Sequence, residues 1–228
     1  MISTILLSGG VGSRSGKNIP KQYCELDGKV IFLYCIDELI KANLVEELVV
    51  VYGDGFKDLI VKLLNNYKNC FSCIKFVKGG STRQESVLNG LKECSGSRVL
   101  LHESARPLIT DEELLKVANH PSQNVTMGID IPFTVLKHRD GKIDSILNRE
   151  ELFNVQLPQK FNREDLLKAH ICSIKDGRSF TDDSSLMFYY KYDVAVISGS
   201  EENIKITSAN DFSVAEGILN SRKNRSRV

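Results

Sequence analysis

A glycine-rich stretch near the N-terminus, directly after an apolar run, has the composition of an anion-binding loop. Glycines allow close backbone approach, and successive N–H groups in such a loop form a concavity that binds anions. The stretch combines a hydroxyl, three glycines and two cations: Ser8, Gly9, Gly10, Gly12, Arg14 and Lys21. The sequence therefore predicts a polyphosphate site here, although an ordinary strand-to-helix loop has a similar outline.

Neither of two common phosphate-binding motifs accounts for this loop. A P-loop requires G-x-x-x-x-G-K-[ST], but Val11 stands five residues before Gly16, and Asn18 occupies the [ST] position. The dinucleotide fingerprint requires G-x-G-x-x-G, and Gly16 comes one residue too late for it. Pro20 then interrupts any helix that starts in the loop. We expect a nucleotide loop of another kind, and not an NAD-dependent dehydrogenase.

A second glycine turn, within residues 78–87, enters a predicted helix with hydroxyls and a cation in its first turn. Backbone N–H groups at such a turn can hold an anion or read the edge of a base. The candidate residues are Gly80, Ser81, Arg83 and Ser86. The alternative is that Ser81 is only a helix N-cap.

Charged side chains also follow later strands. Glu103 and Arg106 come just after a predicted strand; Glu103 could bind Mg²⁺, which prefers carboxylates and substrate phosphates, or form a surface pair with Arg106. Arg149 could clamp a phosphate through two hydrogen bonds. Thr181 opens a run of helix-capping side chains. An acid, Glu202, lies close to Lys205.

Strand and helix patterns alternate through the first 131 residues. The predicted strands are 2–8, 48–52, 73–77, 98–101 and 125–131, and the predicted helices are 30–42, 56–66, 81–94 and 110–119. This alternation predicts an α/β fold with a doubly wound, mostly parallel sheet, Rossmann-like in outline. Ligands on such sheets bind at the carboxyl ends of the strands, where the glycine loops and Glu103 fall.

The alternation then stops at a predicted hairpin. Apolar-containing runs at 134–137 and 142–147 flank Asp140-Gly141, which is a hairpin signal. We expect one domain over residues 1–228, with a protruding β-arm over 132–156. Helices at 163–173, 182–190 and 208–219 and a strand at 193–198 complete the prediction.

Composition narrows the function classes. The chain has 228 residues, 42% of them hydrophobic, and a net charge of +1, so nothing argues for a nucleic-acid or anionic membrane partner. We found no apolar run of about 20 residues and no signal-peptide layout, and we expect a cytoplasmic protein. The six cysteines have no disulfide framework and lack the spacing of a zinc site. The basic run 222–227 is expected to be a solvated terminus.

Seven motifs, taken together and in this order along the chain, resemble the pattern of a known protein family. They are L-x-G-G-x-G-x-R, I-P-K-Q-Y, G-G-x-x-R-x-x-S-V, H-E-x-A-R-P, N-R-x-x-L-x-x-x-Q-x-P-Q-x-F, T-D-D-x-S and N-I-K-I-T, and they span almost the whole chain. The chain resembles the family of 2-C-methyl-D-erythritol 4-phosphate cytidylyltransferases and ribitol-5-phosphate cytidylyltransferases. The resemblance implies transfer of CMP from CTP to a sugar-alcohol phosphate, with Mg²⁺, giving a CDP-alcohol and pyrophosphate.

The resemblance also implies roles for the candidate residues. Arg14, Lys21 and Lys205 would stabilise charge on the triphosphate, with Ser8 and the first glycines cradling it. Gly80, Ser81 and Ser86 would read cytosine and ribose, supported by Arg83. Arg149, Thr181 and Arg106 would bind the acceptor, and Glu103 and Glu202 would hold the metal. The arm would swap across a homodimer, so that Arg149 serves the neighbouring subunit.

Three positions depart from the family pattern. Glu103 and Glu202 stand where the family usually has aspartate, and Leu157 replaces a threonine. The lost hydroxyl at Leu157, with Ser104 in the H-x-S-x-R-P motif, favours a polyol phosphate such as D-ribitol 5-phosphate over 2-C-methyl-D-erythritol 4-phosphate. Two further hypotheses stay open: a nucleotidyltransferase with a different base and acceptor, and a nucleotide-binding homologue without turnover.

Overall fold

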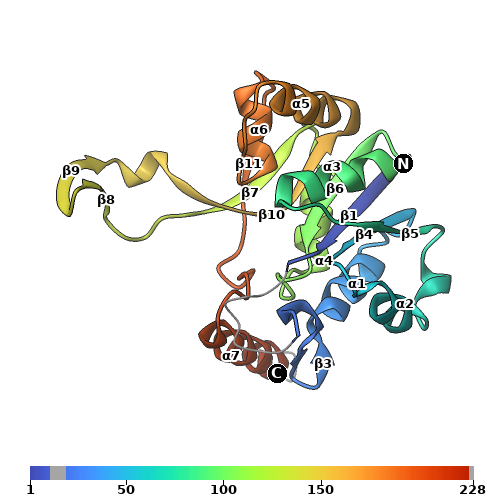
Figure 1. Cartoon of the computed structure of the whole chain (residues 1–228). Coiled ribbons are helices and arrows are strands. Elements are labelled where there is room, and N and C mark those ends of the chain that lie inside the picture. The colour runs from blue at the N-terminus through green and yellow to red at the C-terminus, as the bar shows by residue number, and fades with distance from the viewer. Residues whose placement is uncertain (11–18, 226–228) are drawn as a thin grey trace.

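The computed structural model describes residues 1–10 and 19–225. Its centre is a sheet of seven strands, which Figure 1 shows flanked by helices. The strand order is β11-β7-β10-β6-β1-β4-β5. Every neighbouring pair is parallel except the two that involve β10, which runs antiparallel to β6 and β7. The strands are β1 Ile2–Ser8, β4 Glu47–Tyr52, β5 Ile74–Lys78, β6 Arg98–Glu103, β7 Val125–Asp130, β10 Phe153–Asn162 and β11 Ala195–Ser198. This mostly parallel sheet confirms the predicted fold class.

Helices cover both faces of the sheet because its strands are apolar on both sides. Along β1, Leu6 packs into one core and Ile5 and Leu7 into the other. The first core includes α1 Ile31–Lys41, α2 Lys57–Leu64 and α4 Asp111–Ala118, and the second includes α3 Arg83–Glu93, α5 Arg163–Lys175 and α6 Asp183–Tyr189. A smaller core joins the ribbon β2 Glu25–Leu26 and β3 Lys29–Val30 to α7 Ala209–Arg225.

The sheet directs the candidate residues to one edge. The parallel pairing aligns Ser8, at the end of β1, with Tyr52, at the end of β4, and Leu7 with Glu103, at the end of β6. The second glycine turn follows the end of β5 at Lys78. The predicted segments that precede these ends are confirmed as strands, so the sheet places the two glycine turns and Glu103 side by side.

The strand β10 was absent from the sequence prediction. Its central residues are buried although they read Gln-Leu-Pro-Gln-Lys, and Pro within a run argues against a strand. The proline is accommodated at an irregularity, where the pairing with β7 shifts register between Gln156 and Gln159. The buried polar side chains of β10 form hydrogen bonds, for example from Gln159 Nε2 to the hydroxyl of Thr126 at 2.9 Å.

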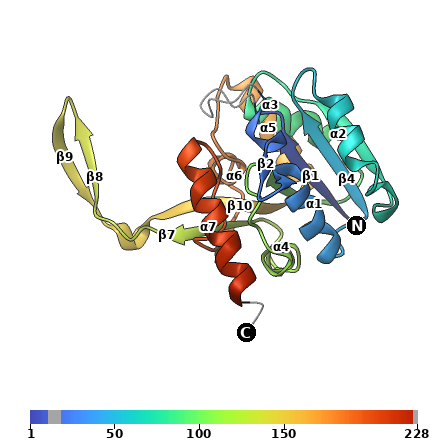
Figure 2. The same ribbon diagram turned by 90° about the horizontal axis from the view of Figure 1, so that it is seen from below.

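The predicted hairpin is confirmed and extends away from the sheet as a two-stranded arm (Figures 1 and 2). Strands β8 Val135–Arg139 and β9 Lys142–Leu147 flank Asp140 and Gly141, which have φ values of 50° and 75° as a tight hairpin turn requires. Apolar side chains on and beside the arm are exposed, including Phe133 and Ile146, each at 76%. Such an unburied surface is typical of a contact with another chain.

The basic C-terminal segment is more than the solvated tail that the sequence predicted. Helix α7 extends to Arg225 and is bound through its cations. Arg222 donates to Glu202 and to the carbonyl of Leu108, Arg225 pairs with Glu202, and Lys223 pairs with Asp27.

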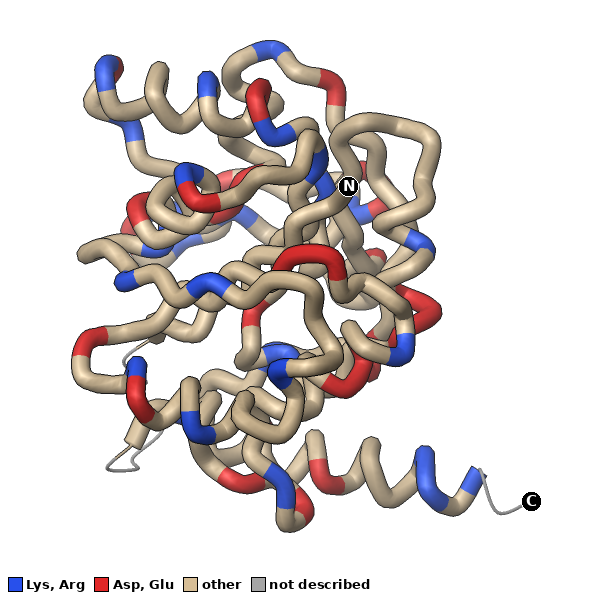
Figure 3. The backbone as a smooth tube through the Cα atoms, turned by 90° about the vertical axis from the view of Figure 1, so that its right-hand side faces the viewer, with Lys and Arg blue, Asp and Glu red and all other residues tan. Residues whose placement is uncertain are grey.

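Over the rest of the described chain, positively and negatively charged residues are interspersed (Figure 3). None of the helices in the described part of the chain combines the length and apolarity needed to cross a bilayer.

Candidate active site

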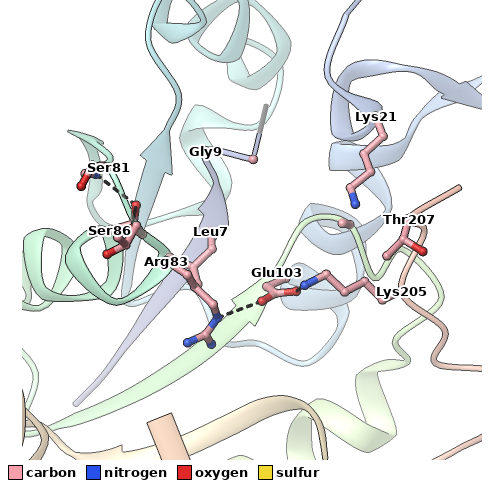
Figure 4. Close-up of a pocket in the computed structure, with 13 residues that line it drawn as sticks. Leu7, Gly9, Lys21, Ser81, Arg83, Ser86, Glu103, Lys205 and Thr207 are labelled. Carbon is pink, nitrogen blue, oxygen red and sulfur yellow. Dashed lines mark hydrogen bonds and ion pairs between the residues drawn. The ribbon is translucent and has the colours of Figure 1, made fainter. Parts of the chain in front are cut away.

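A cavity of about 470 Å³ lies at the carboxyl ends of the central strands and gathers residues from five of the predicted motifs. Gly9 and Gly10 line it from the end of β1, and Lys21 from the 3₁₀ helix η1 Lys21–Tyr23. The turn after β5 contributes Gly80, Ser81, Arg83 and Ser86, β6 contributes Glu103, and the last motif contributes Lys205 and Thr207. The close-up shows Lys21 pointing into the cavity from the side opposite Arg83 (Figure 4). The cavity is therefore cationic, with one carboxylate in its wall.

The carboxylate of Glu103 is held between two cations. Its Oε1 accepts a hydrogen bond from Arg83 Nε at 3.0 Å, and its Oε2 lies 2.5 Å from Lys205 Nζ (Figure 4). Burial alone would raise the pKa of Glu103, but Lys205 and Arg83 outweigh it and lower the pKa to about 2. Glu103 is thus an anion at neutral pH, and the predicted surface pair with Arg106 is replaced by this buried arrangement.

Arg83 also forms an ion pair with a second carboxylate, that of Asp183. Its Nη1 donates to Asp183 at 2.7 Å, and the other carboxylate oxygen of Asp183 lies 3.0 Å from His170 Nε2, whose ring is fully buried. The two carboxylates raise the pKa of Arg83 despite its burial, and Arg83 and His170 lower the pKa of Asp183 to about 2. Sequence reasoning missed Asp183, because its neighbour Asp182 is the N-cap of α6 and both appear as capping groups.

The second glycine turn is pre-shaped by its own side chains. Ser86 Oγ accepts from the N–H of Gly80 at 3.0 Å, and the Glu85 carboxylate accepts from both the N–H and the hydroxyl of Ser81 at 2.7 Å. A Cβ on Gly80 would come within 2.2 Å of the Glu85 side chain, so the turn requires glycine there. Thr82, not Ser81, caps helix α3, which leaves Ser81 at the cavity wall.

The first loop is described only in part. Gly9 and Gly10 line the cavity as predicted, whereas Arg14 and Gly12 lie outside the described residues. Ser8 is 1% exposed, and its hydroxyl donates to Ser104 at 3.0 Å instead of reaching the cavity. Thr207, which sequence reasoning passed over within its motif, does line the cavity, and its hydroxyl and N–H are bound by Asp211 at 2.7 Å.

Besides Ser8, four described residues among those predicted are not brought into this cavity. Arg106 donates to the carbonyl of Asn203 at 2.8 Å and so holds the loop that carries Lys205. Glu202 is paired with Arg222 and Arg225 at 2.7 Å each, which occupies its carboxylate outside the cavity and does not support a metal-binding role. Arg149, at the base of the arm, donates to the carbonyl of Pro132. Thr181 is exposed beside α6.

Few side chains in the described part of the cavity could coordinate a metal ion, since Glu103 is the one carboxylate among its lining residues. Among residues 1–10 and 19–225, no group of three or more His, Cys, Asp or Glu side chains is arranged to hold an ion. Mg²⁺ commonly needs only one or two protein carboxylates when substrate phosphates supply further oxygens. Glu103, an ionised carboxylate in the cavity wall, fits that requirement by itself.

Comparison with known proteins identifies the family. The family model described as 2-C-methyl-D-erythritol 4-phosphate cytidylyltransferase matches residues 2–221. The enzyme of that name from Aquifex aeolicus is 34% identical, over 96% of this chain and 98% of its own, and the chloroplastic rice enzyme is 36% identical, over 97% and 75%. A ribitol-5-phosphate cytidylyltransferase from Vibrio parahaemolyticus is also 34% identical, over 96% of each chain.

A solved structure agrees with this result. The 4-diphosphocytidyl-2C-methyl-D-erythritol synthase from Anaerococcus prevotii superposes with a TM-score of 0.85 and 26% identity, covering 96% of this chain and 98% of its own. The predicted family is therefore confirmed. This chain belongs to the 2-C-methyl-D-erythritol 4-phosphate cytidylyltransferase family and is a nucleotidyltransferase that uses CTP and a phosphorylated sugar substrate.

Proposed function

We propose that this protein transfers CMP from CTP to 2-C-methyl-D-erythritol 4-phosphate, in the cavity around Glu103, and releases pyrophosphate. The observation that carries the proposal is the convergence of Lys21, Lys205 and Arg83 on one cavity that two glycine turns also line. Among eight relatives that are each aligned over at least 95% of this chain, seven bear the name of this activity. The comparisons thus favour this acceptor over the ribitol 5-phosphate that the sequence departures suggested.

The two positions that suggested ribitol 5-phosphate, Leu157 and Ser104, are both buried. Leu157 is 5% exposed and packs in the core formed with α3, α5 and α6, and it does not line the cavity. Ser104 is buried, where its hydroxyl bonds to the carbonyl of Leu7 at 3.1 Å. Neither side chain lines the cavity assigned to CTP, and in this proposal neither contacts the nucleotide.

The proposed reaction is an in-line displacement at phosphorus. An oxygen of the acceptor phosphate forms a bond to the α-phosphorus of CTP, and the bond from that phosphorus to the bridging oxygen of pyrophosphate breaks, with its electron pair leaving on pyrophosphate. Such reactions depend mainly on positioning and on neutralising charge. In this proposal Lys21 and Lys205 neutralise the phosphates, and Gly80, Ser81 and Ser86 read the nucleoside. Arg14, which lies outside the described residues, keeps its predicted role of stabilising charge on the triphosphate.

A divalent cation fits the proposal through Glu103. When bound, Mg²⁺ would supply charge neutralisation to the phosphate oxygens. Glu103 would hold it, and Arg83 would orient Glu103 through their hydrogen bond. Glu202, which is engaged with two arginines of α7, is left out of this metal site.

Acceptor recognition is proposed to need a second chain. Arg149 lies in the short 3₁₀ helix η3 Arg149–Glu151, which follows strand β9 of the arm, and it does not line the cavity of its own chain. The exposed apolar residues of the arm, among them Phe133 and Ile146, support a homodimer in which the arm reaches the neighbouring subunit. In that arrangement Arg149, with Thr181, would bind the acceptor phosphate.

The test is pyrophosphate release with CTP and Mg²⁺ against two acceptors, 2-C-methyl-D-erythritol 4-phosphate and D-ribitol 5-phosphate. We expect release with the first and, because the acceptor site is built for one polyol, roughly 100-fold lower kcat/KM with the second. The second candidate, a ribitol-phosphate enzyme like the Vibrio relative, predicts the reverse order. Release with neither acceptor, while CTP still binds, would contradict both assignments.

A further inference from the structure

The first glycine loop begins with carbonyl groups that the protein holds from one side. Gln22 Nε2 donates to the carbonyls of both Ser8 and Gly10 at 2.8 Å. The hydroxyl of Tyr23 donates to the same Ser8 carbonyl at 2.9 Å. Both side chains are buried, Gln22 at 2% and Tyr23 at 5% exposed, so these hydrogen bonds are shielded from competing water.

The intervening carbonyl, that of Gly9, is constrained by a different contact. A Cβ placed on Gly53, after β4, would lie 3.0 Å from the Gly9 oxygen, so the two backbones touch there. The carbonyls of Ser8 and Gly10 are therefore fixed by hydrogen bonds, and the carbonyl of Gly9 between them is fixed by its contact with Gly53. In a planar trans peptide unit the N–H points opposite to the C=O. The orientations of the Gly9 and Gly10 N–H groups are fixed as a consequence.

We infer that Gln22 and Tyr23 are positioning residues for triphosphate binding, acting through the backbone of Ser8, Gly9 and Gly10. By holding the carbonyls away from the cavity that Gly9 and Gly10 line, they keep oxygen dipoles from facing a polyanion and leave N–H groups for it. This inference rests on the proposed assignment of the cavity to CTP.

Gln22 and Tyr23, which together we call the clamp, lie in the same short helix as the cationic residue Lys21. Lys21, Gln22 and Tyr23 form η1, in which Lys21 lines the cavity while the next two residues face the loop. Tyr23 is fixed further by stacking on Phe56, with ring centroids 4.9 Å apart and planes at 18°. A shift of η1 would thus move Lys21 and the loop together.

Two substitutions test the clamp. Gln22→Met keeps the side-chain length but removes both donated hydrogen bonds, and Tyr23→Phe removes a single hydroxyl. We expect the Kd for CTP, measured by calorimetry with Mg²⁺, to rise about 10- to 100-fold in Gln22→Met and about 3- to 10-fold in Tyr23→Phe. The KM for the acceptor should change less than about twofold in both. Tyr34→Phe is the matched control, because Tyr34 donates to the carbonyl of Leu26, away from the cavity.

The outcomes separate the clamp from the assignment of the cavity. Wild-type CTP affinity in both folded variants, or an equal loss of affinity for both substrates together with a lowered Tm, would overturn the positioning role. Lys205→Met is measured alongside. Should Lys205→Met bind and turn over CTP like the wild type, the assignment of the cavity fails; should it be impaired while both clamp variants are normal, the clamp alone fails.

Discussion

The ammonium group of Lys205 lies 2.5 Å from Oε2 of Glu103, inside the cavity that both residues line. A lysine in this position can exchange its carboxylate partner for a phosphate oxygen, since its side chain is flexible and 39% exposed. Arg83 remains on the other oxygen of Glu103, so the carboxylate keeps a partner during the exchange. We expect Lys205 to make this exchange when CTP binds.

Lys205→Met should lower kcat/KM by about 10²- to 10³-fold, the usual effect of losing one preorganised charge donor. The variant should remain folded, because Glu103 retains Arg83. Lys41→Met is the control, since Lys41 forms an ion pair of the same length with Glu38 on an exposed helix face. Pyrophosphate release gives the rates; equal rates in the two variants would contradict a role for Lys205.

Replacing Glu103 separates its charge from its length. Glu103→Gln keeps the shape but removes the charge, and we expect it to lose activity by more than about 100-fold and to need much more Mg²⁺. Glu103→Asp keeps the charge, and we expect it to stay within about tenfold of wild type. Asp183 restrains Arg83 from following the shortened carboxylate, so some loss is expected. The readout is pyrophosphate release over a Mg²⁺ titration, and full activity in Glu103→Gln would remove the carboxylate from the metal site.

The arm hypothesis predicts complementation between inactive chains. If Arg149 serves the neighbouring subunit, mixing Arg149→Ala with Lys21→Ala chains gives heterodimers with one complete site. Random exchange of equal amounts should restore about a quarter of wild-type activity, because half of the dimers are mixed and each has one working site. Co-expressed, differently tagged chains provide the mixture, and each single variant is the control. A mixture no more active than its components would argue that Arg149 does not act in trans.

Much of the fold could be predicted because local patterns report it. The strand predicted over 48–52 and the helix predicted over 110–119 are confirmed as β4 and α4, and α4 begins with a capping box of Thr110 and Glu113. Strand β10 was not predictable in this way, because its residues Gln156, Gln159 and Lys160 are polar yet buried. Lys160 Nζ donates to the carbonyls of Ala118 and His120, a pairing 40 or more residues away that no local pattern contains.

The same limit applies to the candidate site. Motif order identified Glu103, Lys205 and Arg83, since each follows a strand or a glycine turn that the sheet brings to one edge. The prediction that Glu202 binds the metal did not anticipate its partners, because that carboxylate pairs with Arg222 and Arg225 on α7, a segment expected to be a solvated terminus. The sequence alone does not distinguish a carboxylate that binds a metal from one that forms an ion pair. The difference lies in which residues the tertiary structure places next to it.

The buried carboxylate of Glu47, outside the active site, is expected to make the free energy of unfolding sensitive to acid. Its carboxylate is 1% exposed and accepts hydrogen bonds from Ser3, from the N–H and hydroxyl of Ser95, and from Lys75 at 2.7 Å. Burial raises its pKa, but these partners outweigh burial and lower the pKa from 4.5 to about 2. Because the folded pKa is the lower one, the ionised group stabilises the fold above about pH 4.5, and this contribution disappears as the pH falls toward 2.

Glu47→Gln should therefore reduce the free energy of unfolding at pH 7 by about 2 kcal/mol and flatten its pH dependence between about pH 5 and about 2. Urea titrations at several pH values measure both effects. Glu93→Gln, at an exposed position on α3, is the control and should stay within about 0.5 kcal/mol of wild type. A Glu47→Gln variant that retains the wild-type slope of stability against pH would show that other carboxylates carry the acid sensitivity.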